Sequence, residues 1–385
     1  MTVASRIMSA GDIGTFRGGS GFPVKYQGKK SGDLPFFKVS DMNSAGNELF
    51  MSRANNYISE SRRKSLGAVR VPAGAIVFAK VGAAVFQERK RILAQDSCID
   101  NNMSAFIVDE NLIDVRFAHY LLTTFKMSDL VSVGALPSLN GGQLRSIPLL
   151  VPAELSEQRR IVDAIKSADA LITTLERLIA KKQAIKQGVM QQLLTGRTRL
   201  PGYTDEWAWR PFPEVMIRMN SKKHQVPASS YSGVGHIPVV DQGQEPIIGY
   251  TDRVDIAFDP GAGGVVVFGD HTCITKFVDF RFAVGADGTQ LVKGLPGNST
   301  RFMAHALMAN PIVSTGYNRH FKLLREKVLP VPQLAEQEAI ASVLRDSETE
   351  VNALGVRLRK ARAIKTGIMQ KLLTGRTRLQ VEAVS

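Results

Sequence analysis

Cysteine, tryptophan and long apolar runs are scarce in this chain of 385 residues. Its two cysteines cannot form a disulfide framework or complete a zinc site. The longest apolar stretch, residues 71–86, is interrupted by Lys80 and falls short of the ~20 residues that a membrane span needs. No apolar signal region is visible in the N-terminal segment. We expect a soluble intracellular protein, with a length that suggests two or three domains.

Motifs of catalysis and cofactor binding are also missing. Residues 261–264 are glycine-rich but precede a predicted strand, so they form no dinucleotide fingerprint, and no Walker loop occurs. Residues 309–312 lack the second proline and the aromatic ring of the amino-methyltransferase motif. Residues 88–90 match only the tail of a nuclease pattern, and we interpret them as a solvated charged loop. His271 and Cys273 have no second pair of ligands, so we expect no metal site.

Positive charge is in excess, with 49 lysines and arginines against 35 aspartates and glutamates, a net charge of +14 and an isoelectric point near 9.8. Such a surplus favours a polyanionic partner, because each phosphate that a basic side chain neutralises releases a condensed counterion. The excess is uneven. Residues 1–91 hold 15 basic and 6 acidic side chains, whereas residues 201–330 hold 13 and 12. A solubilising surface is the plain alternative.

The chain repeats itself at a constant offset of 179 residues. Residues 157–200 and 336–379 share 19 of 44 positions, and 15 of the last 20. A Val-Pro step precedes each copy, ending at Pro152 and at Pro332. The repeat is too long, and too exact in its last third, to arise by chance.

Both copies are predicted to be long helices. Their apolar residues alternate at spacings of four and three, which is the seam of a coiled coil. Pro152 and Pro332 bar extension upstream, and Gly196 and Gly375 supply C-terminal stops. About 39 residues at ~1.5 Å each give a rod of roughly 58 Å. We expect the two helices to pair, the alternative being that each packs on its own domain. Three lysines fall on the seam, where we expect looser packing or use of their aliphatic stems: Lys182, Lys186 and Lys365.

The segments between the helices also correspond. Residues 34–39 resemble residues 237–240, and residues 74–78 resemble residues 264–268. We therefore predict an α+β fold in which two mixed, strand-rich domains form a pseudo-two-fold internal repeat with the helices. Two unequal copies of one unit suggest a two-part target that is read once by each copy. The predicted order is domain, helix, domain, helix and tail: residues 1–150, 151–200, 201–330 and 331–385.

The motif Gly-x-Met-Gln-x-Leu-Leu-Thr-Gly-Arg-x-Arg-Leu ends both helical repeats, at residues 188–200 and 367–379. A variable domain followed by a helix with this ending, all of it repeated, resembles the specificity subunit of type I restriction–modification enzymes. Residues 21–43, with Gly-Phe-Pro, Tyr-Gln-Gly and Pro-Phe-Phe-Lys-Val-Ser-Asp-Met-Asn, are similar to the opening of many first recognition domains in that family. Residues 137–140 and 317–321 fit the segments that precede the Val-Pro strands. The resemblance covers essentially the whole chain.

The resemblance implies two target recognition domains, each reading one half of a bipartite site in double-stranded DNA. The helices would be the family's spacer regions, packed as an antiparallel coiled coil, which set the gap and dock two copies of the modification subunit. That subunit binds S-adenosylmethionine and methylates adenine, and a further subunit carries restriction and translocation. The specificity subunit itself would be catalytically inert, would bind no cofactor or metal, and would work in the prokaryotic cytoplasm without a membrane partner.

The perfect copies of Leu-Leu-Thr-Gly-Arg-Thr-Arg-Leu need a cause beyond a helix cap, which requires only the glycine. The first 24 residues of the two repeats share only 4 positions. A shared contact at the helix ends explains the difference, with a cap and a basic tail as the alternative. Gly188 and Gly367 would allow a close backbone approach there. The predicted partner-binding residues at the helix ends are Leu193, Leu194, Thr195, Gly196, Arg197, Arg199, Leu372, Leu373, Thr374, Gly375, Arg376 and Arg378.

We expect DNA contacts from loops that carry basic, amide and aromatic side chains, which suit phosphates and base edges. The candidates in the first domain are Lys25, Tyr26, Gln27, Lys29, Lys30, Lys38, Ser40, Asp41, Asn43, Asn101, Asn102, Ser138 and Asn140. The candidates in the second domain are Gln242, Gln244, Tyr250, His271, Thr272, Lys276, Tyr317, Asn318, Arg319 and His320. For each of them a solvated loop or a structural hydrogen bond is the alternative. The near-neutral second domain implies a weaker phosphate grip, or a tight cluster such as Arg319 with His320.

Two other classes of function stay open. A self-sufficient DNA-modifying enzyme would be active as the purified chain and would need a catalytic motif that is missing here. A coiled-coil scaffold with non-specific DNA binding would bind DNA in a salt-sensitive but sequence-blind way.

Overall fold

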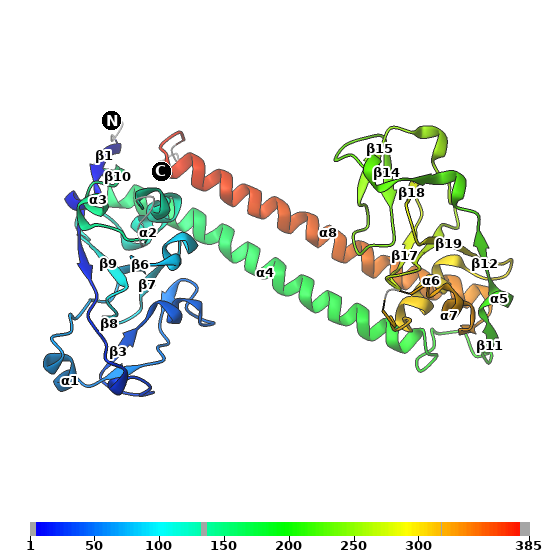
Figure 1. Cartoon of the computed structure of the whole chain (residues 1–385), viewed down its shortest axis with the longest axis horizontal. Coiled ribbons are helices and arrows are strands. Elements are labelled where there is room, and N and C mark those ends of the chain that lie inside the picture. Colours follow the sequence, from blue (N-terminus) through cyan, green and yellow to red (C-terminus); the bar gives the residue numbers. More distant parts are fainter. Residues whose placement is uncertain (1–4, 132–136, 317, 378–385) are drawn as a thin grey trace, which may run out of the picture. The chain divides into compact units, whose positions relative to one another are not determined.

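The computed structural model describes residues 5–131, 137–316 and 318–377. The chain divides into two compact units: unit 1 is residues 1–174 with 358–385, and unit 2 is residues 175–357. Two long helices, α4 (Leu155–Leu193) and α8 (Leu334–Leu373), each contribute one part to each unit (Figure 1). The predicted long helices are thus confirmed. The domain boundaries at residues 150, 200 and 330 stay a prediction.

Unit 1 is built on a five-stranded sheet in the order β2-β9-β6-β7-β4 and a three-stranded sheet in the order β5-β3-β8. An antiparallel ribbon of β1 (Ser5–Ser9) and β10 (Pro148–Pro152) leads into α4. The other strands are β2 (Gly14–Gly18), β3 (Leu34–Phe37), β4 (Phe50–Met51), β5 (Tyr57–Ile58), β6 (Ile76–Ala79), β7 (Lys90–Leu93), β8 (Cys98–Ile99) and β9 (Met103–Val108). The short helices are α1 (Glu60–Ser65), α2 (Val115–Thr124) and α3 (Gly141–Arg145). Strands β3 and β6 are buried along their whole length, as their unbroken apolar sequences require.

Unit 2 repeats this plan with two four-stranded sheets, β12-β19-β16-β17 and β13-β18-β14-β15. An antiparallel ribbon of β11 (Ala208–Pro211) and β20 (Val328–Val331) leads into α8. The other strands are β12 (Met216–Met219), β13 (Gln225–Val226), β14 (Ile237–Val240), β15 (Gly249–Thr251), β16 (Val265–Gly269), β17 (Thr275–Val278), β18 (Ala283–Gly285) and β19 (Thr289–Gly294). The helices are α5 (Phe212–Val215), α6 (Thr300–Ala309) and α7 (Phe321–Arg325).

The predicted correspondence between the two halves is confirmed strand by strand. β14 takes the place of β3, and each is the partner of a parallel strand, β18 or β8. β16 takes the place of β6, and each lies between two antiparallel neighbours. α6 and α7 take the places of α2 and α3 in the chain order. The fold is therefore the predicted α+β internal repeat.

A buried glutamine fastens the first turn of each long helix to its unit. Gln158 accepts a hydrogen bond from the backbone N–H of Asp114 at 2.8 Å and donates to the carbonyl oxygens of Leu112 and Pro152 at 3.0 and 2.9 Å. Gln337 accepts from the N–H of Ser299 and donates to the carbonyl of Pro332, both at 2.8 Å. Both glutamines have no exposed surface.

Asp114 and Ser299 are themselves the N-caps of α2 and α6. The glutamine of the Glu-Gln pair that opens both sequence repeats therefore joins three segments: the Val-Pro segment, the cap of the domain helix and the long helix.

The two long helices run antiparallel where they meet within each unit (Figure 1). In unit 1, Lys365 pairs with Asp169 at 2.6 Å. In unit 2, Lys182 pairs with Glu350 and Lys186 with Glu348, both at 2.7 Å. The three lysines on the predicted seam therefore reach carboxylates of the opposite helix, which interrupts the apolar contact with ion pairs.

The end of each long helix packs into the core of a unit. Leu372 and Leu373 join α2 and β10 in the core of unit 1, and Leu193 and Leu194 join α6 and β20 in the core of unit 2. Both helix ends are capped by the same hydrogen bond. The N–H of Thr198 donates to the carbonyl of Gln192, and the N–H of Thr377 donates to the carbonyl of Lys371, each at 3.2 Å. Gly196 and Gly375 are left-handed, with φ of 69° and 68°, as this cap requires.

The prediction of a solvated charged loop at residues 88–90 is wrong. Lys90 is only 2% exposed and donates to Glu88 and to the carbonyl of Phe125. Burial raises the pKa of Glu88, but hydrogen bonds from Lys90 and from the N–H groups of Ser128 and Met127 outweigh it and bring the pKa to about 2. The hydrogen bonds that this ion pair makes to Phe125, Met127 and Ser128 join β7 to the segment after α2, so the pair has a structural role in unit 1.

Replacing Gln337 with Ala should destabilise unit 2 by about 2–4 kcal/mol, because the variant leaves the N–H of Ser299 and the carbonyl of Pro332 buried without partners. Both tryptophans, Trp207 and Trp209, lie in unit 2, so urea unfolding followed by tryptophan fluorescence reports on that unit. The exposed Gln192→Ala variant is the matched control and should leave the midpoint almost unchanged. Equal shifts in both variants would contradict the role of the buried amide.

Stability of unit 2 should fall as the pH drops from 7 to 5. Burial lowers the pKa of His305 to about 4; Lys186 and Arg301 act in the same direction and Glu348 opposes them. Between its ordinary pKa and pH 4, the imidazole of His305 is therefore protonated in the unfolded state and neutral in the folded state. This difference lowers the free energy of unfolding by up to about 1.4 kcal/mol for each pH unit of acidification. The same fluorescence-detected unfolding, repeated across this range, should show a flatter pH profile for His305→Leu. An unchanged profile would show that other groups carry the dependence.

Candidate nucleic-acid interface

In unit 1, the loop formed by residues 22–30 is anchored at several points. The ring of Phe22 stacks on Phe36 at 3.9 Å, and the side chain of Gln27 donates to the carbonyl of Phe22 at 2.8 Å. Lys38, which follows β3, donates to Gln27 at 3.0 Å. The loop therefore presents its exposed lysines, Lys25, Lys29 and Lys30, from a fixed position.

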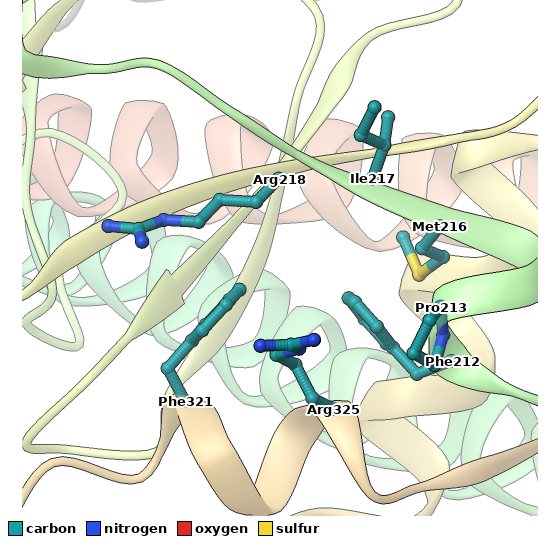
Figure 2. A pocket seen from close by; sticks show the side chains of 7 residues that line it. All are labelled: Phe212, Pro213, Met216, Ile217, Arg218, Phe321 and Arg325. Atoms are coloured by element: carbon teal, nitrogen blue, oxygen red, sulfur yellow. The ribbon is translucent and has the colours of Figure 1, made fainter.

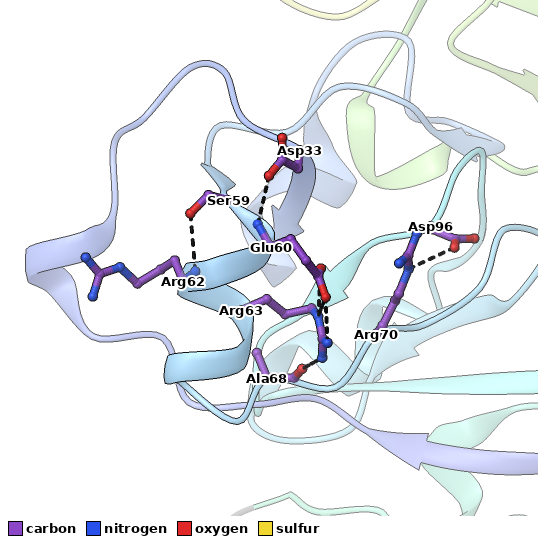
Figure 3. Close-up of polar contacts among 8 residues, drawn as sticks. All are labelled: Asp33, Ser59, Glu60, Arg62, Arg63, Ala68, Arg70 and Asp96. Carbon is purple, nitrogen blue, oxygen red and sulfur yellow. Dashed lines mark hydrogen bonds and ion pairs between the residues drawn. The ribbon is translucent and has the colours of Figure 1, made fainter.

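Helix α1 adds further basic side chains beside this loop, and sequence reasoning missed them. Arg63 is held by Glu60 and by the carbonyl of Ala68, and Arg70 by Asp96 (Figure 3). Arg62 points away from these carboxylates and lies over the ring of Tyr26 at 4.1 Å. Its charge is therefore available to an outside anion. The run Arg-Arg-Lys at residues 62–64 was the signal for this face in the sequence.

The other candidates of unit 1 gather where two parallel strands end. Lys38, Ser40 and Asn43 follow β3, and Asn101 and Asn102 follow β8. Because carboxyl ends of parallel strands meet at the same edge, these segments lie together.

The segment before α3 joins the same edge. Leu139 donates to the carbonyl of Lys80, whose N–H donates to the carbonyl of Asn102, at 2.9 and 2.8 Å. Ser138, next to Leu139, is exposed. We name this set of three segments (residues 38–43, 100–102 and 137–140) the unit 1 edge.

Two candidates of the unit 1 edge have structural partners. Asp41 is fully buried, and its carboxylate accepts from the N–H of Lys38 at 2.7 Å and from the side chain of Asn55 at 2.7 Å. Asn140 is the N-cap of α3 and accepts from the N–H of Gly142 at 2.7 Å. Asn43 shares a hydrogen bond with Arg89 and stays exposed.

Unit 2 brings its candidates together at the matching place. Gln242 follows β14; its side chain accepts from the N–H of His271 at 3.1 Å, and its carbonyl accepts from Thr272 at 2.6 Å. The ring of His271 contacts the carbonyl of Asn318 at 3.1 Å, which ties in the segment before α7. Gln242, His271, Thr272 and Asn318, with exposed Gln244 and Arg319, form what we name the unit 2 edge.

The remaining candidates of unit 2 differ in their surroundings. His320 is fully buried, and its two ring nitrogens contact the carbonyl of Asp270 at 2.9 Å and the N–H of Thr315 at 3.0 Å. Lys276 is half-buried and bonds the carbonyl of Glu245 at 2.8 Å. Tyr250 lies in β15 opposite Pro238, near the start of β14, whereas the unit 2 edge follows the end of that strand. Tyr317 lies outside the described residues.

The predicted helix-end residues are divided between core and surface. The four leucines are buried in this chain's own cores, and Arg199 pairs with the buried Glu336 at 2.6 Å. Trp207 donates to the same carboxylate at 3.1 Å. Exposed positions at the two ends are Thr195, Arg197, Thr374, Gly375 and Arg376, with Gly196 half-buried. Arg378 lies outside the described residues. A Cβ at Gly188 or Gly367 would meet nothing within 4 Å, so none of the described residues makes the close backbone approach expected there.

Neither unit presents a metal centre or a membrane-spanning helix in its described part. Within residues 5–131, 137–316 and 318–377, no three His, Cys, Asp or Glu side chains are grouped to hold a metal ion. Over the same ranges, no helix is both long and apolar enough to cross a membrane. The two edges therefore remain the chief gatherings of predicted functional side chains.

Comparison with known proteins finds relatives among the specificity subunits of type I restriction enzymes. Residues 4–187 match the type I restriction modification DNA specificity domain. The MjaX type I restriction enzyme specificity subunit of Methanocaldococcus jannaschii is 23% identical over 84% of this chain and 83% of its own length. The EcoR124I/EcoR124II specificity subunit of Escherichia coli is 30% identical over 25% of this chain and 24% of its own length.

Solved structures share the fold over almost the whole chain. The S subunit of a type I restriction–modification system from M. genitalium has a TM-score of 0.61 at 12% identity, covering 97% of this chain and 96% of that one. The HsdS subunit of Thermoanaerobacter tengcongensis has a TM-score of 0.51 at 15% identity, covering 98% of both chains. Residues 4–187 thus match the DNA specificity domain of type I restriction–modification systems, and the whole chain, with its repeated helices and two matched units, has the fold of their solved S subunits.

Proposed function

We propose that each unit reads one half of a bipartite target in double-stranded DNA, and that it reads this half with its edge. The observation that carries the proposal is the convergence of three separate segments in each unit, two of which occupy the same topological place in both units. In each unit one segment follows the strand β3 or β14, and another precedes the short helix α3 or α7. The frame is repeated while the side chains on it differ, as expected of two readers of different half-sites.

The chemistry of the edges suits base recognition. Amide side chains such as Gln242, Gln244, Asn43 and Asn101 offer a donor and an acceptor together, which matches the major-groove edge of adenine. The basic face of Lys25, Lys29, Lys30 and Arg62 suits backbone phosphates beside the first half-site. Base reading and phosphate binding are thus assigned to neighbouring but different residues in unit 1.

The long helices are proposed to set the gap between the half-sites and to dock two copies of the adenine methyltransferase subunit. Two large apolar side chains of α4 in unit 2, Leu178 and Ile185, are 36% and 47% exposed and lie seven residues apart. A stripe with this spacing fits against a further helix. The open surface at Gly188 and Gly367 gives such a partner room at both helix ends.

In this proposal the chain is a non-catalytic subunit without a cofactor of its own. S-adenosylmethionine would be bound by the modification subunit, and cleavage and translocation would belong to a restriction subunit. Because the substrate is genomic duplex DNA of a prokaryote, we place the assembly in the cytoplasm.

Exchanging residues 201–330 for the second recognition segment of another specificity subunit should change one half of the methylated motif and leave the other half intact. The expected result follows because the two edges are built from separate segments. Sequencing of methylated adenines in a host that carries the modification subunit measures both halves at once. The matched control exchanges residues 1–150 and should change the opposite half.

A change of both halves in either exchange would contradict the assignment of one half-site to each unit. Methylation by the chain alone would instead show a self-sufficient enzyme. Sequence-blind binding with no methylated motif would show a scaffold.

A further inference from the structure

Unit 2 contains a cavity of about 340 Å³, and none of the candidate DNA-binding residues lines it. Strand β12 forms one side of it, α5 another and α7 a third. Figure 2 shows Arg218 coming from β12 and Arg325 from α7, with the ring of Phe321 between them in this view. The lining residues are Phe212, Pro213, Met216, Ile217, Arg218, Phe321 and Arg325.

The two arginines of this cavity have no carboxylate partner among the described residues. The nearby Glu214 of α5 is engaged by Arg210 at 3.3 Å, and Glu326, directly after α7, makes no ion pair with either of them in that part of the chain. A second, adjoining hollow of about 360 Å³ runs from Arg218 to Lys222. Three cations therefore follow one another along this face without internal neutralisation.

Arg218 is held in place by an aromatic ring that is itself fixed. The N–H of Phe321 donates to the carboxylate of Asp270 at 2.8 Å, and the ring contacts that of Phe212 at a centroid distance of 6.4 Å. The guanidinium of Arg218 lies 5.2 Å from the centre of the Phe321 ring. A guanidinium stacked on a ring keeps its N–H edge free for an anion and loses little further freedom when it binds.

The charge balance of residues 201–330 makes this face distinctive. Several basic side chains of this segment form ion pairs with carboxylates: Arg253 with Asp255, Arg301 with Asp279 and Lys276 with Asp241. The small net charge is therefore not spread evenly, and unneutralised cations concentrate around β12 and α7. Within residues 201–330, this face is therefore the one best suited to a polyanion.

The position of Arg218 is not occupied by an arginine in unit 1, whereas Arg325 has an equivalent there, since Arg145 ends α3 as Arg325 ends α7. The strand registers place Arg218 opposite Val292 in β19 and Phe16 opposite Phe106 in β9, so Phe16 occupies the matching position. The ring of Phe16 stacks on that of Phe106 at 4.5 Å. A partner that docks on both units in the same way would need the feature twice. The contact between Arg218 and the Phe321 ring belongs to unit 2 alone, which favours a ligand that each unit binds differently, namely its own stretch of DNA.

We propose that Arg218, Arg325 and Lys222 bind backbone phosphates of duplex DNA beside the half-site that unit 2 reads. This inference rests on the proposed function, and adds to it the phosphate-binding face that the near-neutral charge of this segment left unassigned. The guanidinium groups would bind the phosphate oxygens, and Phe321 would hold Arg218 ready for them.

The test uses the full chain assembled with its modification subunits and a duplex that carries the methylated motif. Binding is measured across a range of salt concentrations for the wild type and for the double variant R218Q/R325Q. Loss of two phosphate contacts should reduce the slope of log affinity against log salt by about 2 and weaken binding about 10–100-fold, equally for cognate and unrelated duplexes. The variant R218K/R325K keeps the charges and should keep most of the slope.

The control is R210Q, which removes one positive charge at a neighbouring arginine that Glu214 already neutralises, and should keep the wild-type slope. An unchanged slope in R218Q/R325Q, with specific binding by the wild type, would overturn the inference and leave the proposed function standing. Weaker assembly with the modification subunits at an unchanged slope would show that the cavity takes a protein carboxylate, and would also overturn it. A wild-type complex without sequence-specific binding would overturn the proposed function as well.

Discussion

The buried amides of Gln158 and Gln337 are the contacts on which the arrangement of each unit depends. Each joins a long helix to the Val-Pro segment before it and to the N-cap of α2 or α6. An amide without exposed surface tolerates only one geometry, because any shift leaves buried donors and acceptors without partners. The direction in which a long helix leaves its strand-rich segment is thereby fixed. The leucines at the far end of the other helix pack into the same core and complete the unit.

The two units share the contacts that hold them together and differ in the side chains on their surfaces. The shared parts are the ribbon, the N-caps, the glutamines and the glycine-closed helix ends, and the helix ends lie in the nearly exact last third of the sequence repeat. The differing parts stand on the edges and around β12, where Arg218 replaces the stacked Phe16. A frame of this kind accepts new side chains at the reading positions without changing the contacts that hold it.

The sequence predicted much of the frame and less of the site. Helices are local, so spacing, prolines and glycines placed α4 and α8 closely, and strong apolar runs marked β3 and β6. The antiparallel pairing came from the family resemblance. The matched glutamines were visible as repeated letters, but their role depends on caps that lie about forty residues earlier in the chain. Asp41 and His320 read as polar loop residues and are buried, while Arg218 and Arg325 meet only because β12 and α7 fold together. The burial of these residues and their neighbours depend on tertiary contacts, which the periodicity of the sequence does not predict.

The central claim is that this chain directs a methyltransferase to a split DNA site through its two units. Its most direct test maps methylated adenines across a host genome that expresses this chain alone, the modification subunit alone, or both together. The account predicts one bipartite motif with an unread gap, present only when both proteins are expressed. Methylation by this chain alone, or a stable complex of the two proteins that adds no motif, would contradict it.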